Sequence, residues 1–138
     1  MRIDKAIISK YTAFFHDGSL IAIDYGKNDT ELTLTMESAE VAPEELPGNI
    51  ALSDDDRVTG KLHLKGVKNI YIDRKKLLAP LKMNYDDGDI FRFRIKENKV
   101  YLHIIWNNYP LKHSVDDCST VTIDVENLYW ENIPDLET

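Results

Sequence analysis

Regular alternation of apolar and polar residues is the dominant pattern of this chain, and it predicts β-strands. Between Glu31 and Glu37 every second residue is apolar, and successive side chains of a strand point to opposite faces of a sheet. The same alternation occurs in residues 20–25, 61–65, 70–72, 91–95 and 121–125. Residues 100–106 are apolar at nearly every position, which predicts a central strand covered on both faces.

Turn residues between these runs predict two hairpins. Residues 26–30, Gly-Lys-Asn-Asp-Thr, separate the first two strands, and Glu97-Asn98 separates the runs 91–95 and 100–106. Residues 86–89, Asp-Asp-Gly-Asp, predict a further turn immediately before the second hairpin.

Other segments lack a clear strand pattern. Residues 41–56 contain Pro43, Pro47 and Gly48, so we expect a long surface connection with one helical turn near Pro43. Residues 74–79 predict a short helical turn that ends before a proline. The first 15 residues fit either a helix or a strand, and the tail from Asn127 is expected to pack across an open end of the sheet.

Together these elements predict one β-rich domain that spans residues 1–138, since a chain of this length forms a single core. The expected fold is all-β, or mainly β with one short helix, arranged as an antiparallel sandwich or barrel of about seven or eight strands. The predicted core consists of the apolar side of each run: Leu32, Leu34, Met36, Leu62, Leu64, Ile70, Ile72, Phe91, Phe93, Ile95, Val100, Leu102, Ile104, Val121, Ile123 and Val125.

Composition restricts the class of protein. Apolar residues make up 43% and charged residues 30% of the chain, as in soluble globular proteins. There is no apolar run long enough to span a membrane and no apolar stretch near the start, so we expect a cytoplasmic protein without a membrane partner. Cys118 is the single cysteine, which excludes an internal disulfide and a cysteine zinc cluster.

The net charge of −7 is unevenly distributed, because residues 57–99 hold 12 basic and 5 acidic residues while both flanks are acidic. We expect the bases to pair with acids on neighbouring strands. If residues 61–65 and 92–96 were neighbours, their bases would instead form an anion-binding patch. Phe91 and Phe93 are predicted to face the core, so aromatic residues for stacking bases are missing from that face, and we expect no strong nucleic-acid binding.

His16 and Asp17 are the first candidates for chemistry. A histidine next to an acid in a turn could bind a metal or transfer a proton, if His103 or His113 converged on the pair. The alternative is structural: Asp17 and its neighbours hydrogen-bond the turn while Gly18 adopts a positive φ. No metal or other cofactor is expected.

The segment from Phe15 to Met36 combines the sequence His-Asp-Gly-Ser with two apolar strands and a turn. In this it resembles small uncharacterised bacterial proteins, including immunity-type proteins of polymorphic toxin systems. The resemblance covers the first quarter of the chain. It implies a small all-β cytoplasmic protein that neutralises a toxin by binding it, and it transfers no catalytic residues.

Two hypotheses of function follow. The first is a noncatalytic protein-binding module, of immunity type, because motifs for nucleotide binding and hydrolysis are absent from the sequence. Acidic loops would contact a basic, toxin-like partner through Asp54, Asp55, Asp56, Asp116 and Asp117. The alternative is a metal-dependent hydrolase or a small-ligand-binding β-barrel that uses His16 and Asp17.

Overall fold

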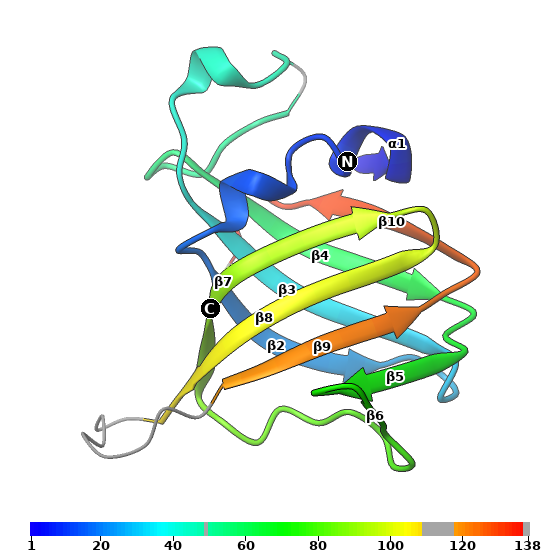
Figure 1. The fold of residues 1–138 in the computed structure, drawn as a ribbon. Coiled ribbons are helices and arrows are strands. Elements are labelled where there is room, and N and C mark those ends of the chain that lie inside the picture. The colour runs from blue at the N-terminus through cyan, green and yellow to red at the C-terminus, as the bar shows by residue number, and fades with distance from the viewer. Residues whose placement is uncertain (49, 109–117, 137–138) are drawn as a thin grey trace.

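The computed structural model describes residues 1–48, 50–108 and 118–136, which form a strongly curved antiparallel sheet (Figure 1). In these residues there are ten strands: β1 (Arg2–Asp4), β2 (Ser19–Tyr25), β3 (Glu31–Glu40), β4 (Arg57–Lys65), β5 (Asn69–Ile72), β6 (Lys75–Lys76), β7 (Asp87–Lys96), β8 (Lys99–Asn107), β9 (Cys118–Asp124) and β10 (Asn127–Asn132). The helical segments are α1 (Lys5–Ile8), η1 (Thr12–Phe15) and η2 (Pro43–Glu45). The predicted all-β antiparallel class is confirmed, and the strand count exceeds the predicted seven or eight because β1, β6 and β10 were not predicted as strands.

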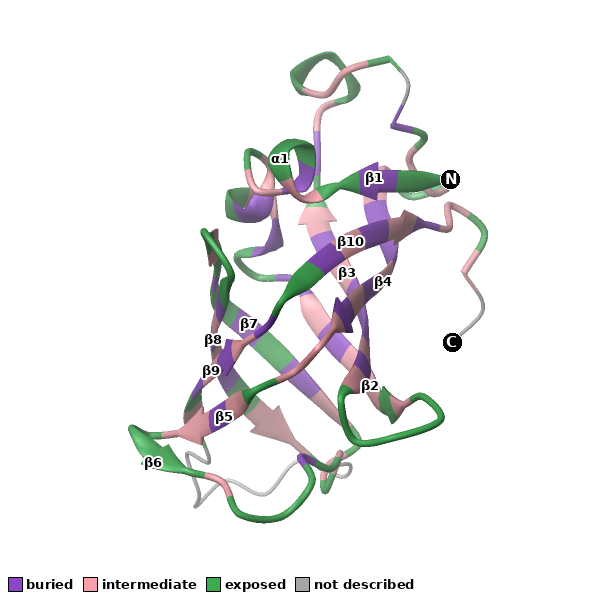
Figure 2. Ribbon diagram, turned by 90° about the vertical axis from the view of Figure 1, so that its right-hand side faces the viewer, coloured by how far each residue is buried: buried purple, intermediate pink, exposed green. Residues whose placement is uncertain are grey.

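The strands follow the order β1-β10-β4-β3-β2-β7-β8-β9-β5-β6 in one open sheet. β2 and β7 pair only where Ser19 and Leu20 lie opposite Asp89 and Gly88. At this short junction the sheet turns, so that the half from β1 to β2 faces the half from β7 to β6 (Figures 1 and 2). β4 and β7 therefore lie in opposite halves, so the condition under which their bases would form one patch is not met.

One hydrophobic core fills the space between the two halves, and Phe15 of η1 connects them. Its ring lies 5.2 Å from the ring of Phe93 in β7 and 5.4 Å from that of Trp130 in β10. β10 pairs with β1 and β4, and the side chain of Trp130 is fully buried in the core. The prediction that this segment packs across an open end of the sheet is therefore wrong. Figure 2 shows the buried positions as bands that alternate with half-buried or exposed ones along the strands.

Most of the predicted core is confirmed, with exceptions on β5 and β7. Ile72 and Ile95 are half-buried, and Phe91 is 48% exposed; the other predicted core residues are buried. The reason for the error at Phe91 is a β-bulge: Ile90 lies opposite Ile104, whereas Arg92 lies opposite His103. The extra residue in β7 breaks the alternation.

Residues 74–79 do not form the predicted helical turn. Asp73 and Arg74 have φ values of 50° and 71° and join β5 to β6 as a two-residue hairpin loop, the arrangement of a type I′ turn. β9 fixes this turn, because the Asp73 backbone N–H donates to the Thr120 carbonyl at 2.8 Å and the Thr120 N–H donates to Asp73 Oδ1 at 2.9 Å.

The N-terminal segment begins with the short strand β1 and continues in helical turns, and α1 includes the residues around Ile7 for which the sequence left helix and strand open. α1 contacts β10, η1 contacts β7, and Lys5 Nζ donates to Asn98 Oδ1 at 2.8 Å. These segments therefore connect the two halves (Figure 1). The predicted helical turn near Pro43 is confirmed as η2. No helix among the described residues is long and apolar enough to cross a membrane.

Candidate binding groove

The outer face of β8 is the first feature of the candidate site. Val100, Leu102 and Ile104 point into the core and are buried, whereas Ile105 is 39% exposed. The prediction that this strand is covered on both faces is therefore wrong: its apolar outer side chains lie at the surface. A contiguous patch of exposed apolar side chains that is rimmed by polar or charged residues marks a candidate interaction site.

A groove of about 540 Å³ runs along this outer face. It is lined by Phe91, Arg92, Arg94 and Lys96 of β7, by Tyr101, Leu102 and His103 of β8, and by Thr120 of β9. We call it the β7–β8 groove. The strand register places Arg92 opposite His103 and Arg94 opposite Tyr101, so each cation lies beside an aromatic ring. The groove thus combines positive charge with flat apolar surface.

The positive charge of the groove is unpaired within the described residues. There, the side chains of Arg92, Arg94 and Lys96 form no ion pair or hydrogen bond. Predicted pairing across strands does occur elsewhere: Lys65 Nζ lies 3.5 Å from Glu31 Oε2, and Lys99 Nζ lies 3.6 Å from Asp124 Oδ1. The expectation that neighbouring acids neutralise the basic segment therefore fails at β7.

Phe91 is held in place by two histidines. Its ring lies 5.4 Å from the ring of His16 and 5.2 Å from that of His103, edge to face in both cases, and the Phe91 carbonyl oxygen lies 2.5 Å from His16 Nδ1. Phe91 consequently faces the same side as Arg92 and Arg94. The prediction that it faces the opposite side is wrong, and with it one reason to expect no nucleic-acid binding.

The structure does not bring His16, Asp17 and His103 together around one point. His16 and His103 each contact Phe91, and Asp17 Oδ2 lies 3.7 Å from His16 Nε2 with its side chain 80% exposed. Within the part of the chain that the structure describes, no three His, Cys, Asp or Glu side chains are placed to hold a metal ion. His113 lies outside the described residues.

The His-Asp-Gly-Ser segment joins η1 to β2 and β7. The Asp17 backbone N–H donates to the Ile90 carbonyl and the Ile90 N–H donates to the Gly18 carbonyl, both at 2.8 Å. Positive φ occurs at Asp17 (67°) and not, as predicted, at Gly18. Gly18 is required for a different reason: a Cβ there would collide with the Glu37 carbonyl oxygen. The segment places His16 against Phe91 at the edge of the groove.

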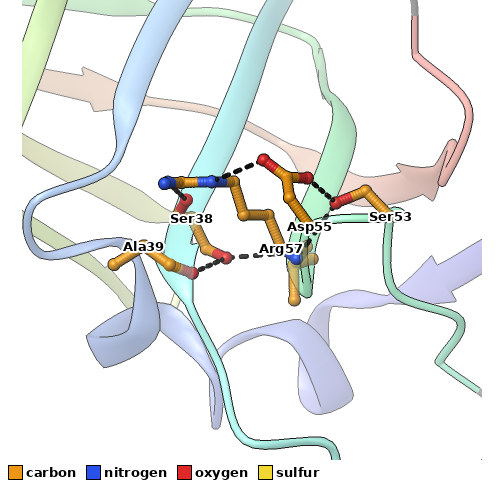
Figure 3. A network of polar contacts seen from close by, with 6 residues as sticks. Ser38, Ala39, Ser53, Asp55 and Arg57 are labelled. Carbon is orange, nitrogen blue, oxygen red and sulfur yellow. Dashed lines mark hydrogen bonds and ion pairs between the residues drawn. The ribbon is translucent and has the colours of Figure 1, made fainter.

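In the acidic loop before β4, the side chain of Asp55 forms hydrogen bonds within the protein (Figure 3). Asp55 accepts hydrogen bonds from Ser53 Oγ at 2.6 Å and from Arg57 Nε at 3.0 Å. Arg57 in turn donates from Nη1 to the Ser38 carbonyl at 3.0 Å. Asp56 is half-buried with a φ of 60°, and Asp54 is exposed. Asp116 and Asp117 lie outside the described residues.

Asp55→Asn is expected to flatten the loss of stability at acid pH. The hydrogen bond from Ser53, aided by Arg57, holds the pKa of the Asp55 carboxyl below its ordinary value. A depressed carboxyl pKa stabilises the fold above the unfolded pKa of about 3.9, and this contribution is lost as the pH falls through the folded pKa. Urea unfolding between about pH 2 and pH 6 measures the difference. Asp54→Asn should keep the wild-type profile, and identical slopes for wild type and Asp55→Asn would contradict the assignment.

Comparisons with known proteins do not indicate a function for this chain. No protein-family model and no curated protein matches the chain. The crystal structure of an uncharacterized protein from Neisseria gonorrhoeae is similar over 96% of this chain and 99% of that chain, with 15% identity and a TM-score of 0.39. A TM-score this low supports no conclusion on fold or function.

Two aromatic groove residues, Phe91 and Tyr101, were not candidates in the sequence. The signal that could have indicated Tyr101 is its position between Val100 and Leu102, which places its ring on the side opposite the core. For Phe91 the sequence offers no local signal, because the bulge that turns it outward depends on pairing with β8.

Proposed function

We propose that this protein is a noncatalytic binding module that holds an anionic partner in the β7–β8 groove. The observation that carries the proposal is the pair Arg92 and Arg94, whose guanidinium groups are unpaired among the described residues and lie beside the exposed ring of Phe91 and the half-buried ring of Tyr101. Guanidinium groups suit phosphate and carboxylate because they offer several N–H donors in one plane. An overall charge of −7 makes a local basic face a specific feature of the surface rather than a general property.

Charge reversal tests the groove directly. The double variant Arg92→Glu/Arg94→Glu should elute from immobilised heparin, a polyanion, at much lower salt than the wild type, because its groove would repel the matrix. Lys10→Glu/Lys27→Glu is the matched control, since it makes the same change of net charge at two exposed lysines that do not line the groove. Equal retention of the two double variants, or no retention of the wild type, would overturn the proposal.

An immunity-type function is the second candidate, and the position of η2 favours it. The connection that contains η2 projects beyond the sheet (Figure 1), and Glu44 and Glu45 are exposed on it together with Asp54. Such a projecting acidic loop suits a basic protein partner. Co-purification with the product of the neighbouring gene, lost in Glu44→Lys/Glu45→Lys and kept in Arg92→Glu/Arg94→Glu, would support this candidate. Loss in the second variant alone would assign the contact to the groove.

A further inference from the structure

We infer that the anionic partner of the groove is a single-stranded nucleic acid, an inference that rests on the proposed function and names its ligand. A single strand is recognised by two features together: cations that follow the phosphates and exposed rings on which bases stack. The outer face of the half from β7 to β6 carries cations and three outward-facing rings, of which Phe91 is exposed and Tyr101 and Tyr71 are half-buried.

A row of cross-strand neighbours extends the groove across five strands. Arg94 lies opposite Tyr101, Tyr101 opposite Thr122, Thr122 opposite Tyr71, and Tyr71 opposite Lys76. Directly opposed residues share one face of a sheet, so these side chains all point outward. With strands about 4.8 Å apart, the row spans roughly 19 Å. It carries a cation at each end and two tyrosines between them.

The neighbouring row adds a third ring, Phe91, which is exposed, and a further cation, Arg92. Phe91, braced by His16 and His103, stands beside Arg92, and a second groove of about 430 Å³ between η1 and β7 is lined by both residues. A single-stranded nucleic acid that follows these rows could place its bases on Phe91, Tyr101 and Tyr71. Its phosphates would then contact Arg92, Arg94 and Lys76. Stacking on these rings requires bases that are free of a partner strand, which a single strand offers and a duplex does not.

The combination of cations and rings on this face favours a nucleic acid over an acidic peptide. A carboxylate peptide would use the arginines, but it would leave the tyrosines without a planar partner. Acids also border the face: Asp89 is exposed on β7 before the bulge, and Asp124 is engaged by Lys99. These two acids lie outside the rows that carry the rings. The same positions therefore supply attraction and stacking.

Fluorescence anisotropy with a labelled oligothymidylate tests the inference. A length of about 12 nucleotides lies within the range of about 4–16 nucleotides that a single-strand-binding OB-fold domain covers. We expect binding at physiological salt that weakens about tenfold in Tyr101→Ala and in Phe91→Ala, the size of one stacking contact. These two variants should keep wild-type retention on heparin. Arg92→Glu/Arg94→Glu should abolish oligonucleotide binding and also lower the salt concentration at which the protein elutes from heparin. Tyr129→Ala, which removes a ring stacked on His63 on the other half, is the aromatic control.

The possible outcomes separate this inference from the proposed function. Retention on heparin without oligonucleotide binding, or with binding that is insensitive to Phe91→Ala and Tyr101→Ala, would overturn the inference and leave the anion-binding groove in place. Displacement of the oligonucleotide by polyglutamate at equal charge concentration would also overturn it, in favour of an acidic peptide. Absence of both retention and binding would overturn the two proposals together. A thermal melt of each variant confirms that the fold is intact.

Discussion

Phe93→Ala is expected to lower the free energy of unfolding by about 3–5 kcal/mol, the range for truncation of a buried aromatic ring. Phe93 is 3% exposed and its ring packs edge to face against Phe15, which in turn contacts Trp130. Loss of the Phe93 ring would leave a cavity between the two halves of the sheet, and the surrounding strands can close it only in part. Urea unfolding followed by tryptophan fluorescence measures the change.

Phe91→Ala is the matched control, because it removes the same ring two residues away on the same strand. Phe91 is 48% exposed, so its truncation should change the free energy of unfolding by about 0.5 kcal/mol or less, as at other surface sites. Similar losses for the two variants would mean that β7 has no bulge and that Phe91 lies in the core. The same variant serves the binding experiment, where its effect should be large.

Local alternation in the sequence was sufficient to predict most of the strands and the class of the fold. Leu32, Leu34 and Met36 are buried as predicted, because their side of β3 depends only on a period of two. β10 was missed for a different reason: its partner β4 is distant in the sequence, and the alternation of Leu128 and Trp130 is short. The burial of Trp130 follows from tertiary pairing.

For the candidate site, the sequence was sufficient to identify some of the residues but not their arrangement in space. The sequence identified the basic segment and His16, which both contribute to the groove region. It did not identify the aromatic side of the groove, because the bulge at Phe91 reverses the predicted direction of one ring. The bulge depends on the register of β7 against β8 and on the contact between His16 and the Phe91 carbonyl, and neither is local in sequence.

Gly60→Ala is expected to destabilise the fold by about 2–3 kcal/mol, as for an overpacked interior position. Gly60 lies in β4 opposite Asn132 of β10, and a Cβ there would collide with the Glu131 carbonyl oxygen and approach Trp130 Cζ2 to 3.0 Å. β10 would have to move away from β4, which would loosen Trp130 in the core. Gly48→Ala is the control, since a Cβ at Gly48 meets nothing within 4 Å. Urea unfolding gives the stability of both variants, and near-ultraviolet circular dichroism reports on the tryptophan packing. A loss below about 0.5 kcal/mol in Gly60→Ala, as at an open surface site, would show that β10 does not lie as close to β4 as the strand register requires.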